Sequence, residues 1–244
     1  PSSEVVHWLC AAEEVRSSVE SPKQFLDLTK YEATWLEPEW FSLKRKATTQ
    51  TYRRSRDGHV QGIFHCHTNF SDGTATLDEM VQAAQTAGYK YIGISDHSQS
   101  SFYAQGLKVD RLLEQSELIK KLQKKVKIKI FHGIESDILA DGALDYPEDV
   151  LARFDFIVGS IHNRFQMQGP EMTKRIVNAL KHPRVTIWGH PTGRLLLGRK
   201  AYEIDWDACV ETAAKHGVAV EFNANPQRLD VDWRQGPLLE KNNA

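Results

Sequence analysis

The chain has 244 residues, of which 41% are hydrophobic and 26% charged, and its formal net charge is −1 with histidine neutral. This length suits one large α/β domain with a short appendage, in an ordinary globular composition. The near-neutral charge excludes a global polycation, so any binding of a polyanion has to come from local patches or from bound metal. The 3 cysteines contain no CxxC pair, which argues against a disulfide scaffold and favours a cytoplasmic setting. No apolar run reaches the length of a membrane span.

The first 60 residues differ from the rest of the chain. They are expected to contain a helix over residues 5–19, followed by a basic segment from Lys44 to Arg56. That segment is either a contact for backbone phosphates or a solvated linker, and its composition favours the linker. We therefore expect residues 1–60 to form a helical N-terminal extension with a basic linker, and residues 61–244 to form a separate domain.

Strand patterns recur at regular intervals through the second part of the chain. In chain order, the expected strands are Ile63–His67, Tyr89–Asp96, Lys127–Ile134, Phe154–Ile161, Val185–Gly189 and Val218–Phe222. Helical patterns separate them, and strands that alternate with helices in this way predict a parallel sheet. The number of units suggests a barrel.

The expected helices carry recognisable start and stop signals. Thr76 and Glu79 form a capping box for a helix that runs to Gly88, and Gly217 closes the last helix. The other expected helices are 110–125, a short one from 146 to about 153, 170–181 and 205–216. In helix 110–125, the residues expected on one side are Leu112, Leu113, Leu118, Ile119 and Leu122.

The stretch HCHTNFSDG follows the first expected strand. Side chains alternate along a strand, so His65 and His67 should share one face while Cys66 faces the other way. Asp72 follows in a turn that ends in glycine. Two imidazoles and a carboxylate in this arrangement indicate either the start of a metal site or a pair of surface histidines near a turn.

Polar residues also end the other expected strands, which favours the metal site. They are His97, Glu135, His162, His190, and the pair Asn223 and Asn225. The carboxyl ends of the strands in a parallel barrel converge on one face, where active sites form. His132 is expected to face the opposite side from Glu135 unless a loop or bulge brings it round.

The chain offers seven candidate metal ligands, which are His65, His67, Asp72, His97, Glu135, His162 and His190. This set without thiolate suits manganese, zinc or iron, and its size suggests two or three divalent ions with Glu135 as a bridge. Clustered ions favour phosphoester hydrolysis, so Glu135 and Asp72 are candidate catalytic residues. Arg194 is a candidate catalytic phosphate clamp or else a loop salt bridge, and Arg164 is a weaker phosphate-binding candidate.

The motifs HCHTNFSDG, ISDHS, GIESDI, GSIHNR and GHPTGR resemble those of the PHP (polymerase and histidinol phosphatase) family. Further segments, such as DGALDYPEDVL and EFNANPQRLDVDW, resemble the C-terminal PHP domain of bacterial and archaeal family X DNA polymerases. The resemblance covers roughly residues 60–234. It implies a distorted TIM-like (β/α)7 barrel, a trinuclear centre on the seven ligands, and metal-dependent 3′–5′ exonuclease activity on DNA 3′ ends.

The chain departs from the family pattern near its end. The family closes its site with an Asp-x-His motif after another helix and strand, and no such motif follows DVDW here. We therefore expect a C-terminally incomplete PHP domain without its last unit, in which one metal lacks a protein ligand. The sequence is then either a fragment of a longer protein, which could include a polymerase domain, or a naturally shortened chain.

Three functions are compatible with these observations. The leading hypothesis is a phosphoesterase that processes DNA 3′ ends, alone or with a polymerase. The second is a small-molecule phosphatase of the histidinol-phosphate type, which would use the same metals. The third is a non-catalytic PHP module that positions DNA or supports structure.

Overall fold

The structure, a computed structural model, describes residues 60–244. The helical extension and basic linker expected before this point lie outside the described residues. No helix within residues 60–244 combines the length and the apolar character needed to cross a membrane.

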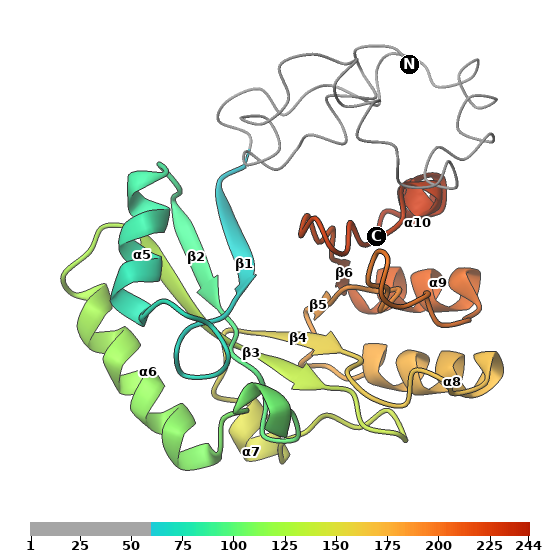
Figure 1. Cartoon of the computed structure of the whole chain (residues 1–244), viewed down its shortest axis with the longest axis horizontal. Coiled ribbons are helices and arrows are strands. Elements are labelled where there is room, and N and C mark those ends of the chain that lie inside the picture. Colours follow the sequence, from blue (N-terminus) through green and yellow to red (C-terminus); the bar gives the residue numbers. More distant parts are fainter. Residues whose placement is uncertain (1–59) are drawn as a thin grey trace, which may run out of the picture. The chain divides into compact units, whose positions relative to one another are not determined.

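Six parallel strands form one sheet, in which each strand pairs with its neighbours in the sequence. They are β1 (Gly62–Cys66), β2 (Tyr91–Ile94), β3 (Lys129–Asp137), β4 (Phe156–Ser160), β5 (Ile187–Trp188) and β6 (Ala219–Val220). Figure 1 shows how the strand direction turns from β1 to β4. Within residues 60–244, β1 pairs only with β2 and β6 only with β5, so the curled sheet is open. The α/β fold with the parallel strands of a distorted TIM-like barrel is therefore confirmed.

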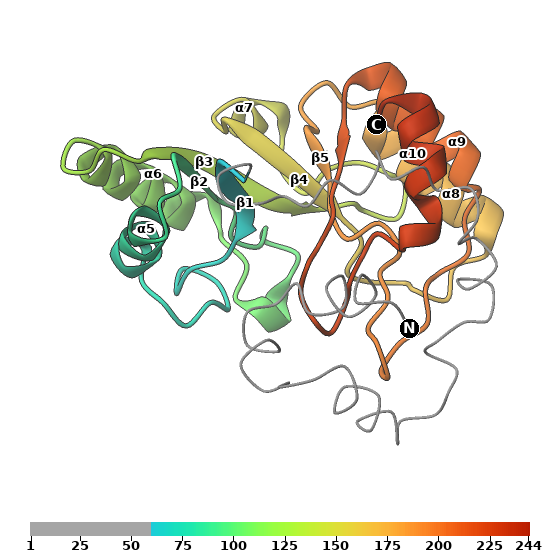
Figure 2. The ribbon, with the colours of Figure 1, turned by 90° about the horizontal axis from the view of Figure 1, so that it is seen from above.

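Helices follow the strands in alternation. They are α5 (Leu77–Thr86), α6 (Val109–Gln123), α7 (Glu148–Leu151), α8 (Gly169–Leu180), α9 (Trp206–His216) and α10 (Gly236–Asn242). Figure 2 shows α5 and α6 together beside β1 to β3, and α8 to α10 grouped beside β5. The sequence did not predict α10, or the short 3₁₀ helices η4 (Phe102–Ala104) and η5 (Trp233–Gln235).

The predicted helix signals form as expected. Thr76 Oγ1 accepts a hydrogen bond from the Glu79 amide at 3.3 Å, and the Glu79 carboxylate accepts one from the Thr76 amide at 2.7 Å. Gly217 ends α9 with a φ of 68°, a left-handed conformation that favours glycine. Because the capping box fixes the start of α5, it also fixes the end of the loop that carries His67 and Asp72.

The buried side of α6 differs from the prediction. Leu113 and Leu118 are 40% and 39% exposed. The buried positions are Leu112, Gln115, Ile119 and Leu122. These positions are three or four residues apart and line one side of a helix. Gln115 is buried because its side-chain amide donates a hydrogen bond to Asp96, which lies next to the site.

Two apolar clusters support the sheet. The larger lies among β3 to β5 and α7 to α9, and the smaller lies between α5, α6 and β1 to β3. A third group of aromatic rings lies next to the site residues, where Phe64 and Phe156 are 4.8 Å apart between ring centroids. A Cβ at Gly93 or Gly133 would come within 2.4 Å of one of these rings, so both glycines make room for the aromatic layer. Glu135 is two residues after Gly133, so both share one face of β3.

Candidate metal centre

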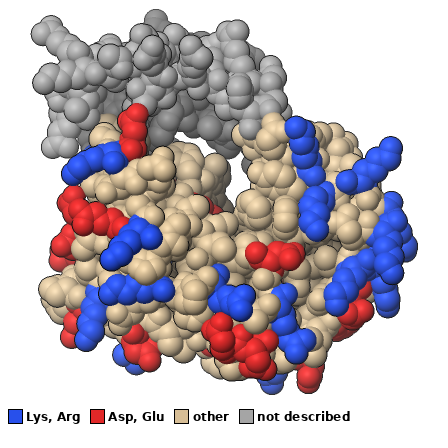
Figure 3. All heavy atoms as spheres, turned by 180° about the vertical axis from the view of Figure 1, so that it is seen from behind, with Lys and Arg blue, Asp and Glu red and all other residues tan. Residues whose placement is uncertain are grey.

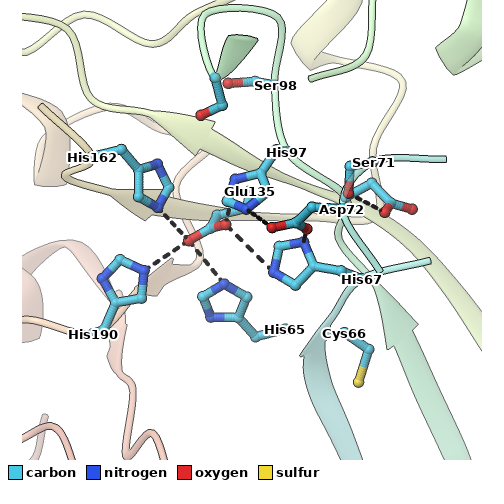
Figure 4. Close-up of polar contacts among 12 residues, drawn as sticks. His65, Cys66, His67, Ser71, Asp72, His97, Ser98, Glu135, His162 and His190 are labelled. Atoms are coloured by element: carbon cyan, nitrogen blue, oxygen red, sulfur yellow. Dashed lines mark hydrogen bonds and ion pairs between the residues drawn. The ribbon is translucent and has the colours of Figure 1, made fainter. Parts of the chain in front are cut away.

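The first two histidines converge through an irregular strand end. His65 has a φ of 62°, and the pairing of β1 with β2 shifts register between Ile63 and Cys66. His67 lies beyond the end of β1. The expected regular alternation is therefore wrong, although both imidazoles do reach the same place. Cys66 turns away from them, as Figure 4 shows, and packs against the smaller apolar cluster.

Glu135 lies at the centre of the site and is fully buried. Its Oε1 lies 2.9 Å from His65 Nε2, 3.1 Å from His162 Nε2 and 2.9 Å from His190 Nε2. Its Oε2 lies 2.9 Å from His97 Nδ1 and 3.5 Å from His67 Nε2. Figure 4 shows the five rings surrounding this carboxylate. Each histidine comes from the end of β1, β2, β4 or β5, or from the residues just beyond it.

The ligand atoms fall into three overlapping groups, each within 4.8 Å. The groups are His65–Glu135–His190, His97–Glu135–His162 and His67–Asp72–His97. Glu135 belongs to two groups and His97 to two. Asp72, whose side chain is 48% exposed, lies 3.7 Å from His67 and 3.6 Å from His97. The structure thus brings together all seven predicted ligands, and their clusters suit a site for more than one metal.

Two carboxylates contact the Nδ1 atoms of His65 and His162, the ring nitrogens that face away from Glu135. Glu221 lies just after β6, and its Oε1 is 2.5 Å from His65 Nδ1. Its Oε2 accepts a hydrogen bond from the His190 amide at 2.5 Å. Asp137 Oδ1 is 2.5 Å from His162 Nδ1 and accepts a hydrogen bond from Ser101 Oγ at 2.8 Å. A carboxylate on Nδ1 orients the ring and leaves Nε2 for a metal.

Neither of these carboxylates was among the residues predicted from the sequence. Asp137 lies two residues after Glu135, so the period of a strand puts it on the same face. Glu221 lies just after β6, and most of the other site residues lie likewise at or just after the end of a strand. It was placed inside the sixth strand because that strand was expected to continue to Phe222, whereas β6 ends at Val220. The expected polar residue Asn223 instead hydrogen-bonds to Glu221 at 3.4 Å.

Glu221 provides a test of this outer layer of contacts. Replacing Glu221 with alanine should weaken metal binding about 10- to 100-fold, because His65 loses the partner that fixes its ring. A competition titration against a chelator measures the change. Glu211→Ala removes an exposed carboxylate from α9 and should leave affinity unchanged. Equal affinities in the wild type and Glu221→Ala would show that Glu221 does not support the site.

Asp96 anchors the loop that carries His67 and Asp72. Its carboxylate accepts hydrogen bonds from the Thr68 amide at 2.7 Å and from Ser71 Oγ at 2.5 Å. Gln115 of α6 donates a further hydrogen bond at 2.6 Å. Ser71 Oγ therefore stabilises the turn through Asp96. His132 faces α6, with Nε2 3.2 Å from Gln115 Oε1, so no bulge brings it into the site.

Burial and neighbouring charges shift the pKa values of four histidines, two downwards and two upwards. Burial lowers the pKa of His67 and of His190 to about 4. Burial also opposes a charge on His65 and His162, but Glu135 with Glu221 or Asp137 outweighs it and raises their pKa values to about 10 and about 9. Burial likewise opposes a charge on Glu135, but the facing histidines hold its pKa well below the usual range.

Metal binding should therefore release protons. Because these raised pKa values lie above 7.5, we expect His65 and His162 to be protonated at pH 7.5 in the metal-free chain, whereas a metal ligand must be neutral imidazole. We expect about two protons released per chain, and an affinity that rises as the pH increases towards 9. Calorimetric titration in two buffers of different ionisation enthalpy counts these protons. A binding enthalpy independent of the buffer would contradict the prediction.

The side chains fit a metal cluster because several polar atoms lack another partner. Within residues 60–244, the buried atoms without a hydrogen bond include His67 Nδ1, His97 Nδ1 and Glu135 Oε2, and the last two face each other at 2.9 Å. The Asp72 contacts, at 3.6 and 3.7 Å, are too long for hydrogen bonds. Ligands bonded at about 2.1 Å to one shared ion lie roughly 3–3.6 Å apart, which is close to these separations.

The two candidate arginines lie in different settings. Arg194 Nη1 is 2.5 Å from Asp232, Nε donates to the Arg228 carbonyl at 2.8 Å, and Nη2 donates to the Leu229 carbonyl. Arg194 thus forms the loop salt bridge that was the alternative to a phosphate clamp, and its guanidinium is committed to the loop. Arg164 is exposed after β4. Roles for either arginine in catalysis or phosphate binding remain predictions.

Comparison with known proteins places the chain in a family. Residues 64–225 match the family described as the PHP domain. The chain belongs to the PHP domain family. The matched residues include all seven candidate ligands.

This PHP domain is similar in sequence to two bacterial proteins whose names state an activity. The chain is 43% identical over 175 residues to a Bacillus subtilis protein named "DNA polymerase/3′-5′ exonuclease PolX", covering 71% of this chain and 31% of that protein. It is 36% identical over 171 residues to a "Probable phosphatase" of Caldicellulosiruptor saccharolyticus, covering 65% of this chain and 64% of that protein. The chain therefore spans less than two thirds of either relative.

A solved structure also resembles the domain. It is the histidinol phosphate phosphatase of Lactococcus lactis, in complex with zinc, L-histidinol and phosphate. The TM-score is 0.48 and the sequence identity 19%, with 66% of this chain and 72% of that chain covered.

Proposed function

We propose that this PHP domain hydrolyses phosphoesters with two or three divalent metal ions, and that its substrates are DNA 3′ ends. The observation that carries the hydrolase proposal is the sharing of buried Glu135 between two of the three ligand groups. A carboxylate between two such groups is suited to bridge neighbouring ions. Its two oxygens face different histidines, as a bridge requires.

The ligand types indicate which metals the three groups would bind. The His65–Glu135–His190 and His97–Glu135–His162 groups are buried or nearly so, while the His67–Asp72–His97 group reaches solvent through Asp72. Imidazole and carboxylate ligands without thiolate suit manganese, zinc or iron. Bound ions of this kind activate water and offset the charge that develops when a phosphoester is cleaved. The protein's own contribution is to hold the ligands in place through Glu221, Asp137 and Asp96.

Two observations favour DNA as the substrate. The relative named as a polymerase and 3′-5′ exonuclease is 43% identical to this chain, against 36% for the relative named as a phosphatase. The described surface also has a local basic patch, formed by Lys120, Lys121, Lys124, Lys125, Lys127 and Lys129. Figure 3 shows basic side chains gathered along the edge that α6 occupies. A patch of this kind attracts phosphate backbones even though the net charge is close to zero. It lies at the amino end of β3, away from the end that carries Glu135, so it bears on DNA binding and not on the chemistry at the site.

The polymerase relative suggests a setting for this activity. Because the chain spans 31% of that protein, a polymerase domain is a proposed partner, within one longer chain or as a separate protein. A 3′-end nuclease beside a polymerase would remove nucleotides that the polymerase cannot extend. A cytoplasmic location is part of the same proposal.

A small-molecule phosphatase is the second candidate, favoured by the relative named as a phosphatase, of which this chain covers 64%. The same ligand groups would serve a phosphomonoester. The two candidates differ in whether the active site accepts a DNA strand, so comparing substrates separates them.

The deciding experiment compares substrates on the purified chain with Mn²⁺ added. We expect stepwise nucleotide release from a 5′-labelled single-stranded oligonucleotide and slower phosphate release from histidinol phosphate. Asp72→Ala should lower nucleotide release at least about tenfold, because one ligand group loses its carboxylate. Asp149→Ala, at an exposed position of α7, is the matched control. Faster release from histidinol phosphate would favour the phosphatase, and no release from either substrate would indicate a non-catalytic module.

A further inference from the structure

Two aromatic side chains are exposed in the loop that follows His97, and one of them lies beside the metal centre. Phe102 is 84% exposed and Tyr103 71% exposed, and both lie in η4, in the loop between Ser98 and Leu107. Single exposed apolar side chains are common, but an aromatic ring with a polar tip is a side chain that interfaces favour, and its position relative to the ligands decides its interest. Neither ring belongs to the apolar clusters of the domain.

Tyr103 lies close to two ligand histidines. Its ring centroid is 6.1 Å from that of His97 and 6.5 Å from that of His162. These two rings are the ones drawn above Glu135 in Figure 4. Tyr103 therefore borders the His97–Glu135–His162 group while most of its surface stays open to solvent.

The loop that carries these rings is held firmly. The Ser100 amide donates to Asp145 Oδ2 at 2.6 Å, and Gln99 Nε2 donates to the Asp145 carbonyl at 2.7 Å. Ser101 Oγ donates to Asp137, the carboxylate that orients His162. Ala104, which follows Tyr103, is 1% exposed and anchors η4. The exposed rings thus stand on a backbone fixed to the site, so little ordering entropy is lost when a ligand stacks on them.

We infer that Tyr103 forms a stacking platform for the base of the nucleotide at the DNA 3′ end. This inference rests on the proposed function and names how the same site would recognise its substrate. A nucleobase is joined to its phosphate through one sugar, so a phosphate at the ligand groups puts its base within reach of a ring about 6 Å from His97. Stacking on an aromatic side chain accepts any base, as an end-processing nuclease requires.

The test compares two single-stranded oligonucleotides that differ only at the 3′-terminal nucleotide, which either carries a base or is abasic. Base stacking on an aromatic ring corresponds to roughly 5- to 150-fold in affinity. For the oligonucleotide whose terminal nucleotide carries a base, Tyr103→Ala should lower kcat/KM about tenfold, mainly through a higher KM. For the abasic oligonucleotide, Tyr103→Ala should leave kcat/KM unchanged. Tyr103→Phe keeps the ring and should behave as wild type. Leu113→Ala removes an exposed side chain from α6 and is the matched control.

A binding measurement keeps the platform testable if the chain proves not to cleave DNA. Oligonucleotides with a terminal phosphorothioate linkage are titrated by fluorescence anisotropy in Mn²⁺, again with based and abasic ends. A preference for the based end that Tyr103→Ala removes supports the platform, whatever the cleavage assay shows. Equal binding of both ends by the wild type would overturn it. So would equal losses for both ends in Tyr103→Ala, or a Tyr103 effect confined to histidinol phosphate.

Discussion

Glu135→Ala should abolish metal-dependent phosphoester hydrolysis, with a fall of about a thousandfold or more. Glu135 belongs to two of the three ligand groups, so its loss leaves two sets of histidines without a carboxylate. Several kcal/mol of charge stabilisation depend on the bound ions, and each 1.36 kcal/mol corresponds to about a tenfold change in rate. The rate of nucleotide or phosphate release under saturating Mn²⁺ measures the effect.

Glu135→Gln separates charge from shape at the same position. It keeps the size of the side chain but removes the negative charge that raises the pKa values of His65 and His162. It should be nearly as inactive as Glu135→Ala, while releasing fewer protons on metal binding. Glu211→Ala, on the exposed side of α9, should retain full activity. A Glu135→Gln variant with near wild-type rates would show that the carboxylate charge is not needed.

Arg175→Met should lower the free energy of unfolding by about 3–5 kcal/mol. Arg175 is 1% exposed, and burial lowers its pKa. Its guanidinium donates hydrogen bonds to the backbone carbonyls of Ile138, Leu139 and Asn163. Methionine would leave these acceptors unsatisfied, and each buried unsatisfied group costs about 1–3 kcal/mol. Thermal unfolding should show a Tm lower by roughly 10 °C.

Arg175 also connects the fold to the site. It joins the residues after Asp137 to Asn163, which follows His162, so the variant should weaken metal binding as well. Lys174→Ala, at the exposed neighbouring position of α8, should change Tm little. A wild-type Tm in Arg175→Met would mean that water or a backbone shift satisfies the carbonyls, and that the arginine does not hold the two loops together.

Much of the fold could be predicted because its signals are local. The capping box at Thr76 and the closing glycine at 217 fixed helix ends, and the alternation of strands and helices indicated a parallel sheet. The convergence of seven ligands followed from one rule about strand ends in parallel sheets. The carboxyl ends of the strands converge even where a strand is irregular. His65, for example, has a positive φ and still contributes its ring to the site.

The remaining features depend on contacts between distant parts of the chain. The pairing of His65 with Glu221 spans 156 residues and links the two open edges of the sheet, so no local pattern could indicate it. Arg194 had two equally plausible roles, and only the packing of the loop around Asp232 showed the salt bridge. The burial of Gln115 on α6 could not be foreseen either, because its partner Asp96 lies in another element.

The most direct test of a multinuclear phosphoesterase site is the metal content of the chain, measured by elemental analysis after purification without chelator. We expect two or three divalent ions per chain in the wild type and a clear loss in Glu135→Ala, because Glu135 belongs to two ligand groups. A wild-type chain that holds no metal, or one ion that remains in Glu135→Ala, would contradict it.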